Sequence, residues 1–169
     1  PEKAEQAVED LSDLFRASLG EQNMNPVSEE ISLTKSYLGI EKLRLSDRLQ
    51  VHWEIDENCL ETPVPALCLQ PLVENAIYHG IEPLKKGGKI SISLLNKGEK
   101  LELSVSNPLS AVSATTKRKG NQMAQDNIKQ RLKLVYGSAA EFSINDTKEN
   151  YTVTLIIPLG VNDERAYRR

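Results

Sequence analysis

The stretch "QPLVENAIYHGI", residues 70–81, has the residue spacing of an amphipathic helix with polar groups on one side. On such a helix Asn75 and His79 lie four residues apart, and Glu74 and Tyr78 form the neighbouring pair. The apolar residues fall on the opposite side: Leu69, Leu72, Val73, Ala76 and Ile77. We therefore expect a helix that buries its apolar side and presents Glu74, Asn75 and His79 to a cleft.

The polar side of this helix suits a nucleoside triphosphate. The carboxylate of Glu74 can orient or deprotonate a group, the amide oxygen of Asn75 can bind Mg²⁺, and the imidazole of His79 can donate to phosphate. The same spacing is also typical of a solvent-facing polar stripe, and His79 taken alone could be a capping or surface residue next to Gly80. The helix by itself leaves both interpretations open.

A second group of polar residues favours the binding interpretation. The alternating strand that includes Val105 ends at Asn107, which brings Asn107 to the buried side. A small, polar segment to Lys119 is typical of a flexible loop, and Gly120 then introduces a helix that carries Asn127. A strand end, a flexible segment and a helix N-terminus are places where proteins hold anionic ligands.

The remaining pattern predicts two helices followed by a mixed run of strands and helices. Helices are expected at residues 1–20, from a cap at Ser28 to about Leu45, from near Pro71 to 81 and from Gly120 to Gly137. Alternating strands are expected around residues 51–55, 90–94, 101–105, 142–144 and 151–157, with a proline-punctuated loop at 61–65. Such an order predicts an α+β fold, a two-layer sandwich whose sheet carries helices on one face.

The composition is typical of a soluble globular chain of one domain, with 169 residues, 39% hydrophobic and 27% charged, and a formal net charge of -3. This charge balance argues against direct nucleic-acid binding, which needs a concentrated basic face. Cys59 and Cys68 have no second pair, so both are expected to be reduced packing residues rather than part of a zinc site or a disulfide framework. No apolar run approaches the roughly 20 residues that span a bilayer. The chain begins at Pro1 without Met, and we expect it to be a piece of a longer protein.

Several stretches give the chain a specific resemblance to a known family. "PLVENAIYHGI" resembles the asparagine-containing box of the GHKL ATPases. "LSDLFRASL", "EEISLTKSYLGIEKLRLSDRL", "LCLQPLVENAIYHGI" and "DNIKQRLKLVYG" resemble, in this order, stretches of the LytS-type sensor histidine kinases. The resemblance implies the Bergerat ATP-binding fold, in which ATP lies between a sheet and two helices under a flexible lid. It also implies a helical segment at 1–46 from the dimerisation and phosphoacceptor region, an ATP-binding catalytic domain at 47–159 and a tail at 160–169.

The resemblance assigns roles to the residues of the helix at 70–81. Asn75 would bind the Mg²⁺ that bridges the phosphates of ATP. Glu74 would orient or activate the attacking group, and His79, with Gly80 beside it, would reach the phosphate oxygens.

The resemblance implies an adenine site and a lid as well. Asn107 occupies the place of the acid that reads adenine in the family. Residues 108–120 would form the lid, and Gly120 and the helix of Asn127 would close over the phosphates.

Two stretches depart from the family pattern. The adenine box, D-x-G-x-G in the family, is "NPLSA" here, so the neutral amide of Asn107 replaces the acid and both glycines are absent. The stretch "GNQMAQDN" keeps Gly120 but has Gln122 and Ala124 at the later glycine positions, which reduces backbone freedom. We therefore expect a low affinity for nucleotide, or a pocket that is rebuilt in part.

A histidine kinase places a phosphoryl group on a histidine outside its ATP pocket. The chain has two histidines: His52 is expected at an exposed polar position of a strand, and His79 belongs to the nucleotide box. The acceptor of the family lies in a "PHFLFN"-like stretch that this sequence lacks. The chain is therefore expected to bind ATP and Mg²⁺ without phosphorylating itself.

For the parent protein the resemblance implies a membrane-embedded sensor, so that this region is a cytoplasmic domain of a bacterial inner-membrane protein. It further implies a homodimer formed through the helical region and a response regulator of the LytTR class as partner.

Two other functions stay open. One is a degenerate domain that docks its response regulator, which the altered adenine box favours. The other is a different ATPase of the superfamily, such as an anti-sigma kinase or a chaperone, and "EEISLTKSYLGIEKLR" argues against it.

Overall fold

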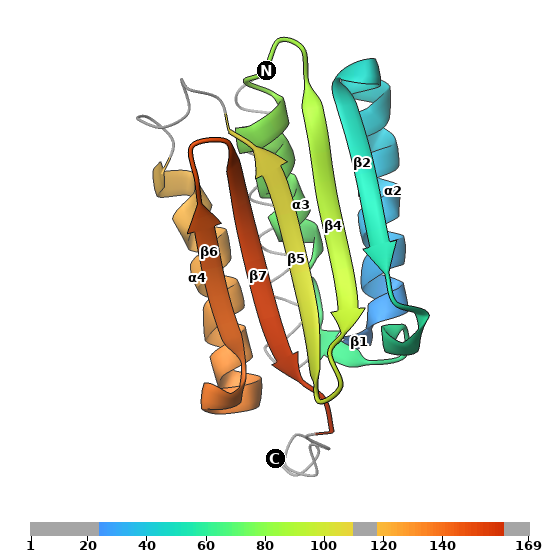
Figure 1. The fold of residues 1–169 in the computed structure, drawn as a ribbon, viewed down its shortest axis with the longest axis vertical. Helices are drawn as coiled ribbons and strands as arrows, with labels where there is room; N and C mark the ends of the chain where they lie inside the picture. Colours follow the sequence, from blue (N-terminus) through green and yellow to red (C-terminus); the bar gives the residue numbers. More distant parts are fainter. Residues whose placement is uncertain (1–23, 110–117, 161–169) are drawn as a thin grey trace, which may run out of the picture.

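The computed structural model describes residues 24–109 and 118–160, apart from the side chains of residues 118–122 (Figure 1). The helix expected at residues 1–20 and nearly all of the expected tail lie outside the described residues. No helix within the described ranges is long and apolar enough to cross a membrane.

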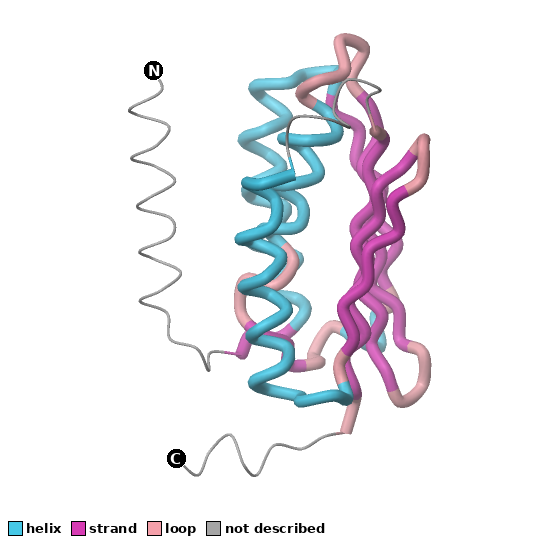
Figure 2. Tube along the Cα trace, turned by 90° about the vertical axis from the view of Figure 1, so that its left-hand side faces the viewer, coloured by secondary structure: helices cyan, strands magenta, loops and turns pink. Residues whose placement is uncertain are grey.

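The described part of the chain has two layers, a five-stranded sheet and three helices that cover one of its faces (Figure 2). The strand order is β2 (Leu49–Ile55), β4 (Gly88–Asn96), β5 (Lys100–Pro108), β7 (Asn150–Pro158) and β6 (Glu141–Asp146). Only the β2–β4 pair of this sheet is parallel. The helices α2 (Val27–Leu45), α3 (Gln70–Ala76) and α4 (Arg118–Tyr136) lie side by side, with α3 in the middle (Figure 1). The predicted α+β sandwich is confirmed.

Short elements complete the fold. A π-helical turn, η3 (Ile77–Ile81), continues α3. The 3-10 turns are η1 (Ser46–Arg48), η2 (Glu57–Cys59) and η4 (Gly137–Ala139). The strands β1 (Met24–Pro26) and β3 (Pro63–Pro65) form a separate antiparallel pair, so the loop expected at 61–65 is in part a strand.

The sheet buries one face because its strands alternate in register. Leu94 lies opposite Leu103, which in turn lies opposite Leu155, and all three side chains are fully buried. The face away from the helices carries hydroxyl pairs, such as Ser93 with Ser104 at 2.8 Å. Alternation of apolar and polar residues therefore predicted the strands correctly, and it predicted the buried side of β4, β5 and β7; on β6, Ile144 is exposed.

The start of α2 differs from the expected cap at Ser28. The helix begins at Val27, after Pro26, and no side chain caps it. The amide of Val27 donates to the carbonyl of Thr62 at 3.0 Å, and the amide of Ser28 donates to the carbonyl of Leu60 at 2.9 Å. The cap prediction was wrong because backbone carbonyls satisfy the first amides of the helix, which leaves no need for a side-chain acceptor.

The start of α4 also differs from the prediction. The helix begins at Arg118, so the expected loop to Lys119 ends early and Gly120 lies in the first helical turn. Arg and Lys are favourable helix formers, which explains why the helix extends past the glycine. The expected stop is confirmed at Gly137, whose φ of 60° suits a glycine after a helix.

The two cysteines are buried and free, and Cys68 carries a testable pH dependence. Burial raises the pKa of the Cys68 thiol well above its ordinary value of 9.0, and the nearby charge of Glu30 raises it further. A raised pKa in the folded state stabilises the fold below the unfolded pKa, and this stability is lost as pH rises above it. We expect the free energy of unfolding to fall between about pH 8.5 and 10, by up to about 1.4 kcal/mol per pH unit.

Urea denaturation across this range would measure the effect, with Cys68→Ala as the comparison. The substitution removes the titrating thiol, so its stability should decline less steeply with pH than that of the wild type. Equal slopes for the two chains would contradict the assignment to Cys68.

Candidate functional site

Glu74 and Asn75 lie on α3, the middle helix of the layer (Figure 1). The apolar side of α3 and of the residues next to it is buried as predicted, at Leu69, Leu72, Val73, Ala76 and Ile77. Pro71 lies in the first turn, where a proline is tolerated, as the sequence suggested. The polar residues Glu74 and Asn75 are each half-buried.

Glu74 lies close to α2. Its carboxylate accepts a hydrogen bond from Nε2 of Gln70 at 2.8 Å. Burial raises the pKa of the Tyr37 phenol on α2, and the negative charges of Glu41 and Glu74 raise it further. Glu74 is therefore within electrostatic reach of α2, a contact that the sequence pattern did not predict.

Asn75 holds a buried amide nitrogen, Nδ2, that has no hydrogen-bond partner among the described residues. Leaving a buried polar group unpaired costs about 1–3 kcal/mol, so this amide suits a ligand that supplies the missing partner. A phosphate oxygen could accept from the nitrogen, and a half-turn of the amide would place its oxygen there for a cation instead.

The described part of the chain has no cluster of three His, Cys, Asp or Glu side chains that could hold a metal ion. Mg²⁺ in nucleotide sites needs no such cluster, because it keeps several waters and binds one or two protein oxygens together with the phosphates. The donor set at Asn75 therefore fits Mg²⁺ held jointly with a nucleotide.

The expected helix at 70–81 changes type in its second half. The amide of Glu82 donates to the carbonyl of Ile77 at 3.0 Å, five residues back, which defines the π turn η3. The rings of Tyr78 and His79 pack edge to face at 4.9 Å between centroids. The predicted alignment of Asn75 with His79 assumed a continuous α-helix, and the wider turn changes the direction of the side chains that follow.

The π turn brings Gly80 against the end of β5. A Cβ atom added at Gly80 would lie 2.3 Å from Nδ2 of Asn107 and 2.7 Å from its Cβ and Cγ. Asn107 is 4% exposed, which confirms that it lies on the buried side. Its Nδ2 donates to the carbonyl oxygen of Pro108 at 2.9 Å, so the side-chain oxygen is the atom available as an acceptor. Two stretches that the sequence separates by 27 residues thus meet at one place.

Comparison with known proteins shows the family to which this chain belongs. A family model described as Histidine kinase matches residues 1–49. Sensor protein LytS of Streptococcus mutans is 32% identical over 174 residues, which cover 96% of this chain and 30% of LytS. Sensor histidine kinase YpdA of Escherichia coli is 33% identical over 148 residues, which cover 81% of this chain and 26% of YpdA. These matches place the chain in the LytS-type sensor histidine kinase family. The chain spans less than a third of the length of these two relatives.

Solved structures support the fold of this LytS-type chain. The catalytic domain of histidine kinase ThkA superposes with a TM-score of 0.58 and 17% identity, over 80% of this chain and 94% of that one. ThkA in complex with response regulator protein TrrA gives a TM-score of 0.59 and 15% identity, over 93% of this chain and 48% of that one. At these identities the likeness concerns the fold, and it agrees with the histidine kinase fold that the sequence predicted.

The sequence pattern did not predict the hydrogen bond between Gln125 and Tyr151, the cross-strand partner of Asn107. Asn107 pairs with Tyr151 across β5 and β7, and the Tyr151 hydroxyl accepts from Nε2 of Gln125 at 2.8 Å. Gln125 is 4% exposed on α4, on the same face as the buried Ile128 and Leu132. A polar residue three and seven positions before two core residues was the available signal.

The structure brings together only some of the predicted site residues of this LytS-type chain. Glu74, Asn75, His79, Gly80 and Asn107 lie on neighbouring elements, because α3 and η3 both contact β5. On α4, Gly120 lies in the first turn and Asn127 is exposed. Residues 110–117 of the predicted lid lie outside the described residues. The catalytic role of Glu74 and Asn75, and the nucleotide-binding roles of Asn75 and the other five residues, stay predictions.

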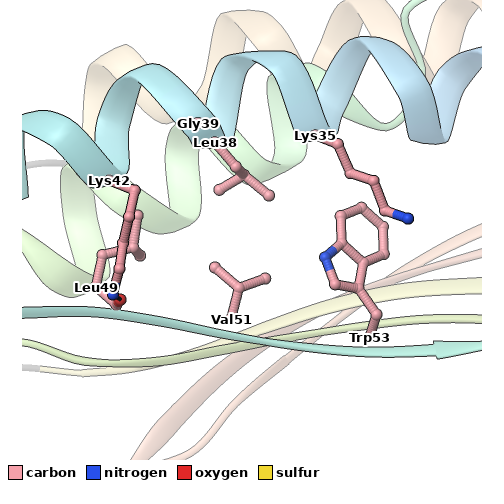
Figure 3. Close-up of a pocket in the computed structure, with 7 residues that line it drawn as sticks. All are labelled: Lys35, Leu38, Gly39, Lys42, Leu49, Val51 and Trp53. Carbon is pink, nitrogen blue, oxygen red and sulfur yellow. Dashed lines mark hydrogen bonds between the residues drawn. The ribbon is translucent and has the colours of Figure 1, made fainter. Parts of the chain in front are cut away.

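A separate groove of about 420 Å³ lies between α2 and the edge strand β2 (Figure 3). Nζ of Lys42 donates to the carbonyl of Leu49 at 2.5 Å, and Nζ of Lys35 lies 5.5 Å from the centroid of the Trp53 ring. Both cations thus take part in packing α2 on β2. None of the predicted site residues lines this groove.

Proposed function

We propose that this chain is the ATP-binding catalytic region of a two-component sensor histidine kinase. In this role it donates the γ-phosphoryl group of ATP to an acceptor histidine of the parent protein. The observation that carries the proposal is the buried amide of Asn75, which lacks a partner among the described residues and lies on the helix next to the Gly80–Asn107 contact. The similarity to LytS and YpdA supports the same activity.

The proposed roles follow the chemistry of the side chains. Asn75 binds Mg²⁺, which neutralises phosphate charge when it is bound with ATP. Glu74 orients or activates the attacking group, and His79, beside Gly80, donates to phosphate oxygens. The side-chain oxygen of Asn107 accepts from the adenine amino group, because its nitrogen already donates to Pro108.

Gly120 and Asn127 of α4, together with the lid at 108–120, are proposed to complete the phosphate site. Their helix begins at Arg118, within the last residues of the proposed lid, and the first amides of a helix favour negative charge. Phosphoryl transfer then depends on positioning and charge neutralisation more than on covalent chemistry.

The acceptor is proposed to be neither of the histidines of this chain. His52 is exposed on β2, and His79 continues the helix of Asn75. The chain alone is therefore proposed to bind ATP without phosphorylating itself. Onward transfer goes to a response regulator of the LytTR class, in keeping with the complex of ThkA with its response regulator.

For the parent protein we propose a homodimer anchored in the bacterial inner membrane, with this region in the cytoplasm. Within the family, the stretches that resemble LytS-type kinases also resemble the alginate-regulating sensor kinase AlgZ, also called FimS. We propose that relationship as the nearest one in the family.

A second function is a docking module that retains the fold and binds nucleotide weakly or not at all. The altered adenine box "NPLSA" favours it, because the amide of Asn107 is a weaker acceptor than a carboxylate. In this case the response regulator is the partner, and Asn75 has no ligand to hold.

Calorimetric titration with a non-hydrolysable ATP analogue, with and without Mg²⁺, distinguishes the two functions. We expect saturable binding that weakens at least about tenfold without Mg²⁺, because the cation joins Asn75 to the phosphates. Adenosine, which lacks phosphates, should bind equally with and without the cation. Absence of heat with the analogue at accessible concentrations would contradict the kinase proposal and favour the docking module.

A further inference from the structure

A buried carboxylate on α2 has no role in the functional site described above. Glu30, on the first turn of α2, is 1% exposed although it is an acid. A buried carboxylate is costly unless hydrogen bonds satisfy its oxygens. Glu30 therefore needs donors from the elements packed around it.

Each carboxylate oxygen of Glu30 accepts two hydrogen bonds. Oε1 accepts from Nδ2 of Asn25 at 3.0 Å and from the amide of Leu67 at 2.7 Å. Oε2 accepts from the amides of Cys68 and Leu69 at 3.0 and 3.2 Å. Three successive backbone amides thus converge on one side chain of α2.

These amides belong to the segment that leads directly into α3. Leu69 donates its amide to Glu30, and its carbonyl accepts from the amides of Leu72 and Val73 in the first turn of α3, at 3.1 and 3.2 Å. Leu67 has a φ of 57°, a left-handed conformation that is rare for leucine and must be held by its surroundings. On the other side, the guanidinium of Arg131 on α4 donates to the carbonyl of Ala66. The segment 66–69 is therefore held from both flanking helices.

We propose that Glu30 is a positioning residue for the nucleotide site. Its two oxygens fix the place and direction in which α3 begins, and α3 carries Asn75 six residues after Leu69. The inference rests on the proposed function, since it concerns how Asn75 is held toward Mg²⁺ and the phosphates. Glu30 itself touches no ligand and acts through the backbone of segment 66–69.

The hydrogen bonds of Glu30 also link β1, the strand that precedes α2, to the start of α3. Asn25 lies in β1, immediately before α2, and donates to the same carboxylate as Leu67. The β1 strand in turn pairs with β3, which precedes segment 66–69. A shift of the chain at β1 would therefore reach α3 through Glu30.

Glu30→Gln tests the proposal with little change in size. A glutamine places an NH₂ group where one oxygen was, so two of the four donors face a donor in either orientation of the amide. Glu29→Gln is the matched control, because Glu29 lies in the same helical turn, is exposed and loses the same charge. Titrations use the wild-type chain and both variants, with the Mg²⁺-loaded ATP analogue and with adenosine, where circular dichroism shows folded protein.

We expect Glu30→Gln to raise the Kd for the Mg²⁺-loaded analogue at least about fivefold relative to Glu29→Gln, with the Kd for adenosine unchanged within about twofold. Amide hydrogen exchange at Leu67, Cys68 and Leu69 should become faster in Glu30→Gln only. A merely structural role would lower thermal stability but leave the two ligands equally affected.

An unchanged Kd for the analogue, or an equal loss for both ligands, would overturn the inference while the wild type still binds. Absence of binding by the wild type would mean that the proposed function fails first and the inference with it. If Glu30→Gln does not fold, Asn25→Ala replaces it, because it withdraws one donor from Oε1. The expected rise in Kd is then at least about twofold, and an unchanged value overturns the inference.

Discussion

Asn75→Ala is expected to abolish Mg²⁺-dependent nucleotide binding, with a loss of affinity of at least about 100-fold. The substitution removes the only group of α3 proposed to hold the cation. It also removes a buried amide nitrogen that has no partner among the described residues. Deleting an unpaired buried donor relieves a desolvation cost, so the chain without ligand should be about as stable as the wild type.

A thermal-shift titration with the ATP analogue and Mg²⁺ would measure both effects at once. A ligand that binds the folded state stabilises it by RT ln(1 + [L]/Kd), so at the same ligand concentration the melting temperature of the wild type should rise and that of Asn75→Ala should not. Asn145→Ala is a matched control, because Asn145 is exposed on β6. A ligand-induced shift in Asn75→Ala equal to that of the wild type would exclude the proposed role of Asn75.

Gly80→Ala is expected to destabilise the fold by about 2–3 kcal/mol and to weaken nucleotide binding. The added methyl group would lie 2.3 Å from Nδ2 of Asn107, closer than atoms can approach, so Asn107 or the π turn must move. Movement of Asn107 would also disturb its hydrogen bond to Pro108. The same methyl group therefore affects stability and the proposed adenine contact together.

Gly39→Ala, in the same layer of helices, is expected to stabilise the fold instead of destabilising it. Gly39 lies inside α2, and apart from its chain neighbours and the backbone of its own helix no heavy atom lies within 4 Å of an added Cβ. Alanine there should stabilise the helix by about 0.5–1 kcal/mol, because it restricts the unfolded chain without a clash. Urea denaturation of both variants would show the contrast. A Gly80→Ala chain as stable as the wild type would mean that Asn107 can be displaced at no cost.

The sheet was predictable because its residues follow a local rule. Alternation placed Leu94, Leu103 and Leu155 on one face, and the same alternation placed Asn107 on the buried side. The polar residues of α3 were also visible in its sequence, since helical spacing separates them from the apolar side. In both cases each position depends on neighbours a few residues away.

The features that the sequence did not predict depend mostly on contacts between distant segments. No local pattern predicts the partners of Glu30, because it accepts from amides 37 to 39 residues further along the chain. The predicted cap at Ser28 was wrong for a related reason, since the carbonyls of Leu60 and Thr62, in the turn before β3, are the acceptors. The π turn at Ile77–Ile81 has no periodic signal of its own, because its amphipathic pattern is that of an α-helix.

The bond from Asn107 to Pro108 has a consequence for the response of the site to acid. A carboxyl group at the end of β5 would take up a proton in acid and lose its charge, which would make it a weaker acceptor from a base. The amide of Asn107 has no proton to gain, and its orientation is fixed by a backbone carbonyl that does not titrate either. On the protein side, the proposed contact of Asn107 with adenine should therefore not titrate, wherever the fold itself persists.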